Sequence, residues 1–211
     1  MAIDVILKYF PNLTDRQIAQ FETLGREYPL WNSRINVISR KDIDNLYTNH
    51  ILHSLAISKF LHEVSPGTTF MDLGTGGGFP GIPLAIVYPE ARFHLIDRIN
   101  KKLTVAKAVS EAAGISNVTF QHGDVGECHS KFNYVVSRAV MRLDSLVGLV
   151  RSNIDRHSSG NLYANGLICL KGGNLEEEIS GVKMPLIDEP LSVYFNEPYF
   201  ETKSLLYIPF V

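Results

Sequence analysis

The sequence predicts an α/β fold, a mostly parallel sheet preceded by a helical segment. After Ser65-Pro66-Gly67, short apolar runs typical of buried strands alternate with helical patterns. Before this break, apolar residues such as Ile3, Ile6, Leu7 and Phe10 recur at helical spacing. We therefore divide the 211-residue chain into a helical cap, residues 1–65, and a sheet domain, residues 66–211.

The order of elements in the sheet domain refines this prediction. Strands are expected at 69–74, 92–97, 117–122, 132–138, 166–171, 191–196 and 203–210, and helices at 80–88, 100–113, 142–153 and 174–181. No helix is expected between the last two strands, so they can pair antiparallel at one edge. A seven-stranded sheet that ends in this way is the usual methyltransferase variation on the doubly wound, Rossmann-like fold.

The segment Asp72–Gly81, with the sequence DLGTGGGFPG, is the strongest functional signal in the chain. It follows an apolar strand and precedes a helix. Glycines permit positive φ and leave room for a ligand beside the backbone, and a helix start offers free N–H groups. The segment therefore predicts a cradle for a nucleotide-type cofactor, with Asp72, Gly76 and Gly78 as candidate contacts.

Two cofactor classes compete for this cradle. Residues 76–81 match the dinucleotide pattern G-x-G-x-x-G, which favours NAD. The carboxylate of Asp72, however, would repel two phosphates and attract the sulfonium and ammonium of S-adenosylmethionine. We therefore expect S-adenosylmethionine, with NAD as the alternative.

Ligands of such sheets bind outside the carboxyl ends of the strands, which points to four further residues. Asp97 ends the second strand and is expected to accept hydrogen bonds from a ribose, or else to cap the next helix. Asp124 is expected to contact an adenine or to serve a turn. Arg138 is expected to pair with the methionine carboxylate or a substrate phosphate. Lys171 is interpreted as a phosphate contact or a surface lysine.

Composition narrows the function classes. A net charge of −2 argues against a general nucleic-acid binder, although a local basic face is compatible with it. The two cysteines, Cys128 and Cys169, lack metal-ligand spacing and suit a reducing compartment. No signal peptide or membrane span is recognised. We expect a cytoplasmic protein without a metal, and a monomer.

The acceptor of the methyl group is indicated by what the site lacks. The residues after the fourth strand, Ser137-Arg138-Ala139-Val140, are not the Asn/Asp-Pro-Pro-aromatic turn of exocyclic-amine methylases. Neither cysteine is placed to serve as the nucleophile of a carbon-5 methylase. The ring nitrogen N7 of guanine needs no general base, so positioning and electrostatics would suffice. No catalytic residue is assigned, and Asn36, His50 and Lys171 are candidates for positioning.

The cap supplies the expected RNA face. Trp31 to Lys41 combine an aromatic ring, two asparagines and three cations, a mixture that RNA recognition uses for stacking, base edges and phosphates. Arg34, Arg40 and Lys41, with Lys171 from the sheet domain, are the expected RNA contacts.

Taken together, these motifs resemble the glucose-inhibited division protein B family, over roughly residues 20–210. The resemblance rests on Asp72–Gly81, Trp31–Ser39, His50-x-x-x-Ser54, Ser137–Ala139 and Leu170–Gly172. It implies a class I methyltransferase that methylates N7 of a guanine in the 530 loop of 16S ribosomal RNA, free or within the small-subunit particle. It also implies cofactor contacts at Gly74, Phe79, Val125, Gly126 and Arg138.

The chain departs from the family at two places. Many members have Arg-His-x-x-Asp-Ser where this chain has Asn49-His50-Ile51-Leu52-His53-Ser54, which leaves residues 49 and 53 without an assigned role. Many members also have an acidic pair where Gly126-Glu127 stands. Two other functions are weighed against a methyltransferase: an NAD-dependent oxidoreductase, and a noncatalytic ribosome-assembly factor that retains the cofactor fold.

Overall fold

The computed structural model describes residues 3–138, 140–157 and 160–211. Ala139, part of the predicted motif after the fourth strand, lies outside the described residues. Met1 and Ala2, at the N-terminus where no signal peptide was predicted, also lie outside them. The described residues form a seven-stranded sheet of order β3-β2-β1-β4-β5-β7-β6. Strands β1 to β5 pair in parallel, whereas β7 is antiparallel to both of its neighbours. The predicted fold class is therefore confirmed.

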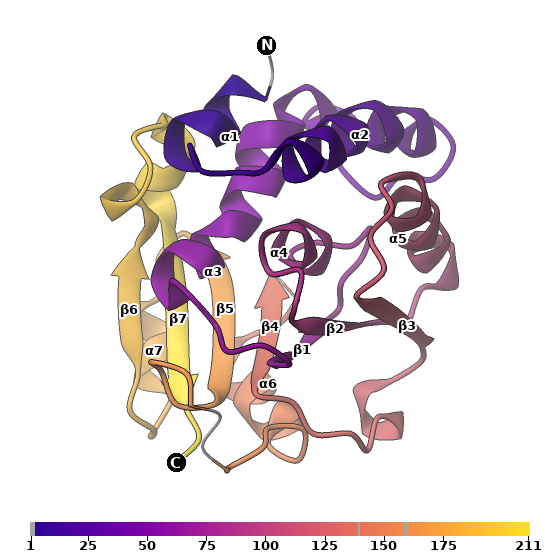
Figure 1. Ribbon diagram of the computed structural model, residues 1–211. Helices are drawn as coiled ribbons and strands as arrows, with labels where there is room; N and C mark the ends of the chain where they lie inside the picture. The colour runs from indigo at the N-terminus through magenta and orange to yellow at the C-terminus, as the bar shows by residue number, and fades with distance from the viewer. Residues whose placement is uncertain (1–2, 139, 158–159) are drawn as a thin grey trace.

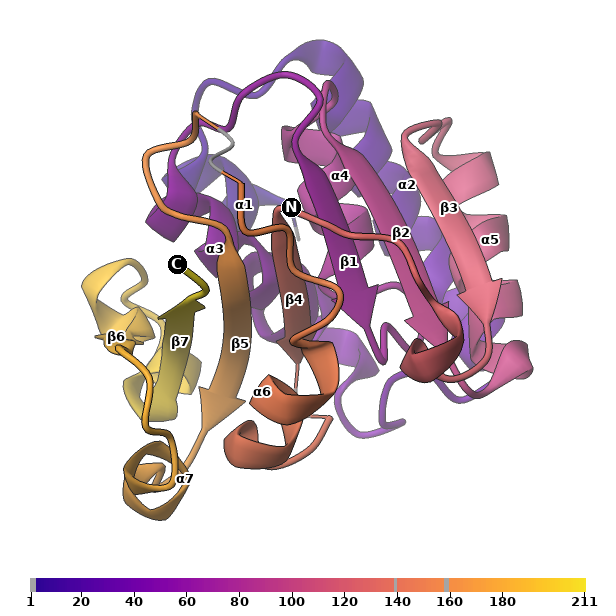
Figure 2. The same ribbon diagram turned by 90° about the horizontal axis from the view of Figure 1, so that it is seen from below.

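The strands are β1 Thr69–Leu73, β2 Arg92–Asp97, β3 Val118–His122, β4 Tyr134–Arg138, β5 Gly166–Gly172, β6 Ile187–Pro190 and β7 Lys203–Pro209. The helices are α1 Asp4–Tyr9, α2 Asp15–Asn32, α3 His53–Leu61, α4 Gly81–Val87, α5 Asn100–Ala112, α6 Leu143–Val150 and α7 Glu176–Ser180. Helices α1 to α5 lie on one side of the sheet, and α6 and α7 on the other (Figure 1). Figure 2 views the sheet from the α6 side.

The cap and the sheet domain share one hydrophobic core. Phe21 and Leu24 of α2 are buried in the same cluster as Phe70 of β1 and Phe93 of β2. This follows from amphipathicity, because α2 has an apolar stripe that a free helix could not bury. The cap is thus packed on the sheet domain through α4 and α5. A second cluster, which includes Met71, fills the space under α6.

One expected strand was wrong in its position. A strand was predicted at 191–196, but β6 ends at Pro190 and residues 191–193 form a 3-10 turn. Proline has no N–H to continue a ladder. The turn instead brings Leu191 and Phe195 into the core, where both are buried. The apolar residues that suggested a strand are therefore buried residues of a turn and of the segment that follows it. The expected antiparallel pair at the sheet edge is confirmed, with β6 on β7.

In the part of the chain that the structure describes, no helix combines the length and apolar character that crossing a bilayer requires.

Candidate active site

A cavity of about 980 Å³ opens at the carboxyl ends of β1 to β5, where the parallel sheet predicts a ligand. Residues from the cap also line it, so the cavity lies between the two parts of the chain. The predicted site residues that line it are Gly74, Gly76, Phe79, Asp97, Val125, Arg138, His50 and Lys171. Those that do not are Asp72, Gly78, Asp124, Gly126, Asn36, Arg34, Arg40 and Lys41.

Within the glycine loop, Gly76 is the residue with open space in front of it. Gly74, Gly76 and Gly78 all have positive φ, as the sequence motif predicts. An added Cβ would lie 2.6 Å from Val140 at Gly74 and 2.2 Å from Ile82 at Gly78. At Gly76 its nearest neighbour would be the Lys102 side chain at 4.0 Å. A ligand can therefore approach the backbone at Gly76, whereas at Gly74 and Gly78 a side chain would collide with Val140 and Ile82.

Asp72 lies beneath the loop and shapes it. Its carboxylate is fully buried, and Oδ2 accepts hydrogen bonds from the Thr75 hydroxyl at 2.6 Å and the Gly81 amide at 2.7 Å. Oδ1 is buried without a hydrogen-bond partner among the described residues. Burial raises the pKa of Asp72 to about 7, against the lowering effect of these hydrogen bonds. The prediction that Asp72 presents a negative charge to the ligand was therefore wrong. Asp72 is instead a buried group whose hydrogen bonds join the end of β1 to the start of α4.

Asp97 joins the glycine loop to the turn after β2. Its Oδ2 accepts from the Gly76 amide at 2.7 Å, and its Oδ1 accepts from the Ile99 amide at 2.8 Å, just before α5. Both sequence interpretations therefore have support, because Asp97 lines the cavity and also serves the turn that precedes the helix. Its contact with a ribose stays a prediction.

Asp124 serves the turn after β3. Its carboxylate accepts from the Gly126 amide at 2.8 Å and pairs with Arg98. The hydrogen bond from the Gly126 amide makes the largest contribution to holding the pKa of Asp124 below its usual range. The turn interpretation fits these contacts, and the neighbouring residues Gly123 and Val125 line the cavity.

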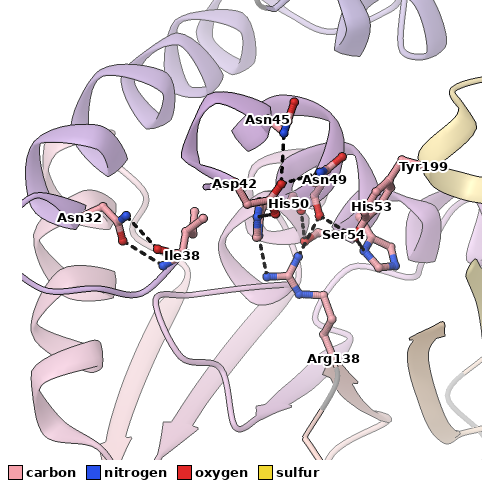
Figure 3. Close-up of polar contacts among 10 residues, drawn as sticks. All are labelled: Asn32, Ile38, Asp42, Asn45, Asn49, His50, His53, Ser54, Arg138 and Tyr199. Atoms are coloured by element: carbon pink, nitrogen blue, oxygen red, sulfur yellow. Dashed lines mark hydrogen bonds and ion pairs between the residues drawn. The ribbon is translucent and has the colours of Figure 1, made fainter. Parts of the chain in front are cut away.

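Arg138, at the end of β4, contacts residues of the cap (Figure 3). It donates to the Asn49 carbonyl at 3.3 Å and to His50 Nδ1 at 3.1 Å, and it lies over the Phe79 ring at 5.0 Å. No ion pair among the described residues includes Arg138. Burial lowers its pKa, so the charge is costly where it is. An anion in the cavity would complete its coordination.

His50 connects Arg138 to Asp42, which the sequence analysis missed. His50 Nε2 lies 2.7 Å from Asp42 Oδ2. A guanidinium only donates, so Nδ1 accepts from Arg138 and Nε2 carries the proton that Asp42 accepts. Burial and the Arg138 charge lower the pKa of His50 to about 4, against the raising effect of Asp42. The imidazole is therefore neutral near pH 7, with both nitrogens engaged.

Asn49 and His53, which differ from many members of the family that the sequence resembles, lie beside this network. The Tyr199 hydroxyl donates to the Asn49 carbonyl at 3.3 Å, and its oxygen lies 3.1 Å from His53 Nδ1. With the hydroxyl proton so used, Nδ1 carries the hydrogen of that second bond. Burial, with the Arg138 charge, holds the pKa of His53 well below its usual range. His53 is thus a neutral, buried wall residue.

Lys171 is a bridge between two loops. Its side chain is 9% exposed, and the ammonium pairs with Glu178 at 2.6 Å and donates to the Met141 carbonyl. Glu178 also accepts from the Leu143 amide at 2.9 Å. Two of the three ammonium hydrogens are thus engaged within the protein, so Lys171 holds these two loops together, and its contact with an RNA phosphate stays a prediction.

The cap segment 33–41 packs against the glycine loop. Asn32 is buried, where its side chain donates to the Ile38 carbonyl and accepts from the Ile38 amide (Figure 3). Asn32 therefore holds the segment together, whereas the sequence suggested a contact with a base edge. Tyr28 donates to the Gly77 carbonyl at 2.8 Å, and Val37 fills the space beside Gly77. Arg34, Asn36, Arg40 and Lys41 are among the exposed polar residues of this segment.

Within residues 3–138, 140–157 and 160–211, no group of three or more His, Cys, Asp or Glu side chains is arranged to hold a metal ion. Both cysteines are buried, and burial raises the pKa of Cys169 to about 12, which makes its thiol unreactive.

Comparison with known proteins gives consistent results. Residues 17–189 match the family model described as rRNA small subunit methyltransferase G. Proteins named ribosomal RNA small subunit methyltransferase G are 53% identical in Phocaeicola vulgatus, over 98% of both chains, and 53% identical in Bacteroides thetaiotaomicron, over 97% of this chain and 98% of the relative. Fibrillarin of Aeropyrum pernix, solved with natively bound S-adenosyl-L-methionine, has a TM-score of 0.52 at 12% identity, with 73% of each chain covered, a likeness of fold alone.

The buried carboxyl of Asp72 makes a prediction about stability. A folded-state pKa of about 7, raised from 3.8, means that the folded protein binds the extra proton between these values. Its contribution is therefore best at low pH and is lost as the pH rises toward 7. Asp72→Asn has no carboxyl group to titrate, so the variant should not lose this stability. The difference in free energy of unfolding, variant minus wild type, should therefore rise by roughly 2–3 kcal/mol from pH 5 to pH 8. Urea unfolding at both pH values measures it, and a difference that does not change with pH would contradict the assignment.

Proposed function

The chain belongs to the rRNA small subunit methyltransferase G family, and we propose that it transfers a methyl group from S-adenosylmethionine to N7 of a guanine in the 530 loop of 16S ribosomal RNA. One observation carries the proposal beyond family membership. A single cavity brings together an open glycine loop, an acidic strand end and an Arg138 guanidinium without a counterion. This is the set of groups that an amino-acid nucleoside requires.

The residues of this cavity fit S-adenosylmethionine. The backbone at Gly76 leaves space for the ligand, Asp97 can accept from ribose hydroxyls with its remaining lone pairs, and Arg138 offers N–H groups to the methionine carboxylate. Val125 and the half-exposed Ile99 supply apolar surface for the adenine. When bound, the cofactor supplies an electrophilic methyl group on a sulfonium.

The acceptor half of the cavity suits a nucleophile that needs no deprotonation. His50 has both ring nitrogens engaged, and His53 Nε2 is inaccessible to solvent. Neither imidazole therefore offers a free base at the cavity surface. The lone pair of guanine N7 is available at neutral pH, so the protein's contribution is to orient the two reactants and exclude water. Lys171 and Glu178 fix the loops of β4 and β5 for this purpose.

The exposed cations of segment 33–41 are proposed to hold the RNA. Arg34, Arg40 and Lys41 project from the segment that packs on the glycine loop, so RNA bound there would lie beside the cofactor. Asn36 is exposed on the same segment and is available for a polar contact. The substrate is proposed to be 16S rRNA or the small-subunit particle, and we propose a cytoplasmic location on the same ground. We further propose that it acts as a monomer and without a metal.

Methyl transfer itself tests this function. Purified protein with radiolabelled S-adenosylmethionine should label 16S rRNA or 30S particles from cells that lack the gene, and mass-spectrometric mapping should find 7-methylguanosine in the 530 loop. Label at another position would refute the assigned acceptor. Absence of transfer to both substrates, despite cofactor binding, would favour the assembly-factor alternative. Neither that alternative nor an NAD-dependent oxidoreductase is favoured by the family.

The glycine loop gives the first prediction of this proposal. Gly76→Ala places a methyl group in the space left for the cofactor, at φ +58°. Gly114→Ala is the matched control, because Gly114 has φ +62° in a turn with nothing within 4 Å of the added Cβ. Both changes should cost about 1 kcal/mol of stability. Only Gly76→Ala should weaken S-adenosylhomocysteine binding, by roughly tenfold or more in calorimetry. Equal binding by both variants would show that the loop is not the cradle.

The cap cations give the second prediction. The triple change of Arg34, Arg40 and Lys41 to Ala should weaken binding to a 530-loop RNA and reduce the slope of log affinity against log salt by about one per lost contact. Cofactor affinity should not change.

The matched control is the triple change of Arg92, Lys131 and Arg156 to Ala. It removes the same charge from exposed residues near the amino ends of β2 and β4, opposite the cavity. Salt titrations of both triple variants separate a local contact from net charge. Equal losses in the two would mean that segment 33–41 is not the RNA face.

A further inference from the structure

The orientation of Arg138 is set by groups that carry no net charge. Its hydrogen-bond partners are the Asn49 carbonyl and the neutral His50 ring, and the Phe79 face lies alongside. An arginine side chain has many rotamers, and a guanidinium that binds a carboxylate must present a defined pair of N–H groups. The two bonds to the cap remove this freedom, because they engage one N–H on each of the terminal nitrogens.

Asp42 fixes the tautomer of His50, so that Nδ1 is the acceptor that faces Arg138. The carboxylate accepts the Nε2 proton at 2.7 Å, which leaves the Nδ1 lone pair for Arg138. If the ring carried its proton on Nδ1 instead, an N–H would face the guanidinium and repel it. The tautomer, and with it the Arg138 bond, thus depends on the carboxylate of Asp42.

Asp42 is itself held rigidly although it is 31% exposed. Its Oδ1 accepts from Asn49 Nδ2 at 2.7 Å and from Asn45 Nδ2 at 3.2 Å. These bonds outweigh the effect of partial burial and hold the pKa of Asp42 below its usual range. Asn49 therefore binds Asp42 with its side chain and Arg138 with its carbonyl, so the contacts close into a ring (Figure 3). We call Asp42, Asn49 and His50 the cap bracket.

We infer that Asp42 and His50 are positioning residues that orient Arg138 toward the carboxylate of the cofactor's methionine moiety. This rests on the proposed function, in which that carboxylate is the missing counterion. The cap thereby contributes to cofactor binding without touching the cofactor. The bracket is not a proton relay, because both nitrogens of His50 are already engaged.

Two ligands separate positioning from a general structural effect. S-adenosylhomocysteine carries the amino-acid carboxylate, whereas 5′-methylthioadenosine keeps the adenosine and sulfur and lacks it. Asp42→Asn should weaken S-adenosylhomocysteine roughly tenfold in calorimetry, the scale of one lost hydrogen bond to a charged group. Binding of 5′-methylthioadenosine should change less than twofold.

Asp44→Asn is the matched control. Asp44 is exposed two residues along the same segment, and the same substitution removes the same charge. Neither ligand should respond to it. If Asp42→Asn weakens both ligands equally, the bracket merely shapes the cavity and the inference fails. It also fails if S-adenosylhomocysteine binds Asp42→Asn as it binds the wild type.

Variants at positions 50 and 138 complete the test. His50→Gln keeps one acceptor and one donor and should retain more affinity for S-adenosylhomocysteine than His50→Ala. In an Arg138→Ala background, Asp42→Asn should have no further effect, because the two act through one contact. A full additional loss there would overturn the inference. Arg138→Ala alone reports on the proposed function: unchanged S-adenosylhomocysteine affinity would refute the carboxylate site itself, independently of the bracket.

Discussion

The Arg138 guanidinium is a charge that the protein leaves unpaired, and the arrangement of the site follows from this constraint. Removing a cation from water is costly unless hydrogen bonds or a counterion compensate. Here the fold provides two hydrogen bonds and an aromatic face. In the proposed function, the carboxylate of the cofactor supplies the remaining compensation. The hydrogen-bond partners of Arg138 are Asn49 and His50, which explains why cap residues help to form the cavity.

A second consequence is that the cap and the sheet domain form one site. Tyr28 and Val37 pack on Gly77, and His50 packs on Phe79, with ring centroids 5.6 Å apart. The shared core of α2, β1 and β2 fixes this contact, because the cap cannot shift without exposing Phe21 and Leu24. The segment that carries the exposed cations is therefore held against the loop that is proposed to bind the cofactor. In the proposed function, recognition of RNA and orientation of the methyl donor therefore depend on the same packing contacts.

Much of the fold was predictable from the sequence because its signals are local. The apolar runs and the glycine pattern located six strands and the loop. The rule for parallel sheets pointed to Asp97, Arg138 and Lys171, which line one cavity with Gly76, and also to Asp124, which serves a turn instead. The sixth strand was misplaced because burial of Leu191 in a turn resembles burial in a strand.

The parts of the site that could not be predicted depend on pairing between distant segments. The partners of Lys171 come from the loop after β4 and from α7. Asp42 and His50 meet because residues 43–52 fold into consecutive 3-10 and π-helical turns, for which no spacing rule exists. Asp72 was predicted as a ligand-facing charge, and only the closure of the loop over it shows that it is buried.

The most direct measurement is a crystal structure of the protein with S-adenosylhomocysteine. The account predicts the adenosine between the glycine loop and Val125, and a carboxylate oxygen about 2.8 Å from an Arg138 nitrogen whose bonds to His50 and Asn49 are retained. A ligand carboxylate held elsewhere, with the Arg138 guanidinium still without an anion, would contradict the central claim.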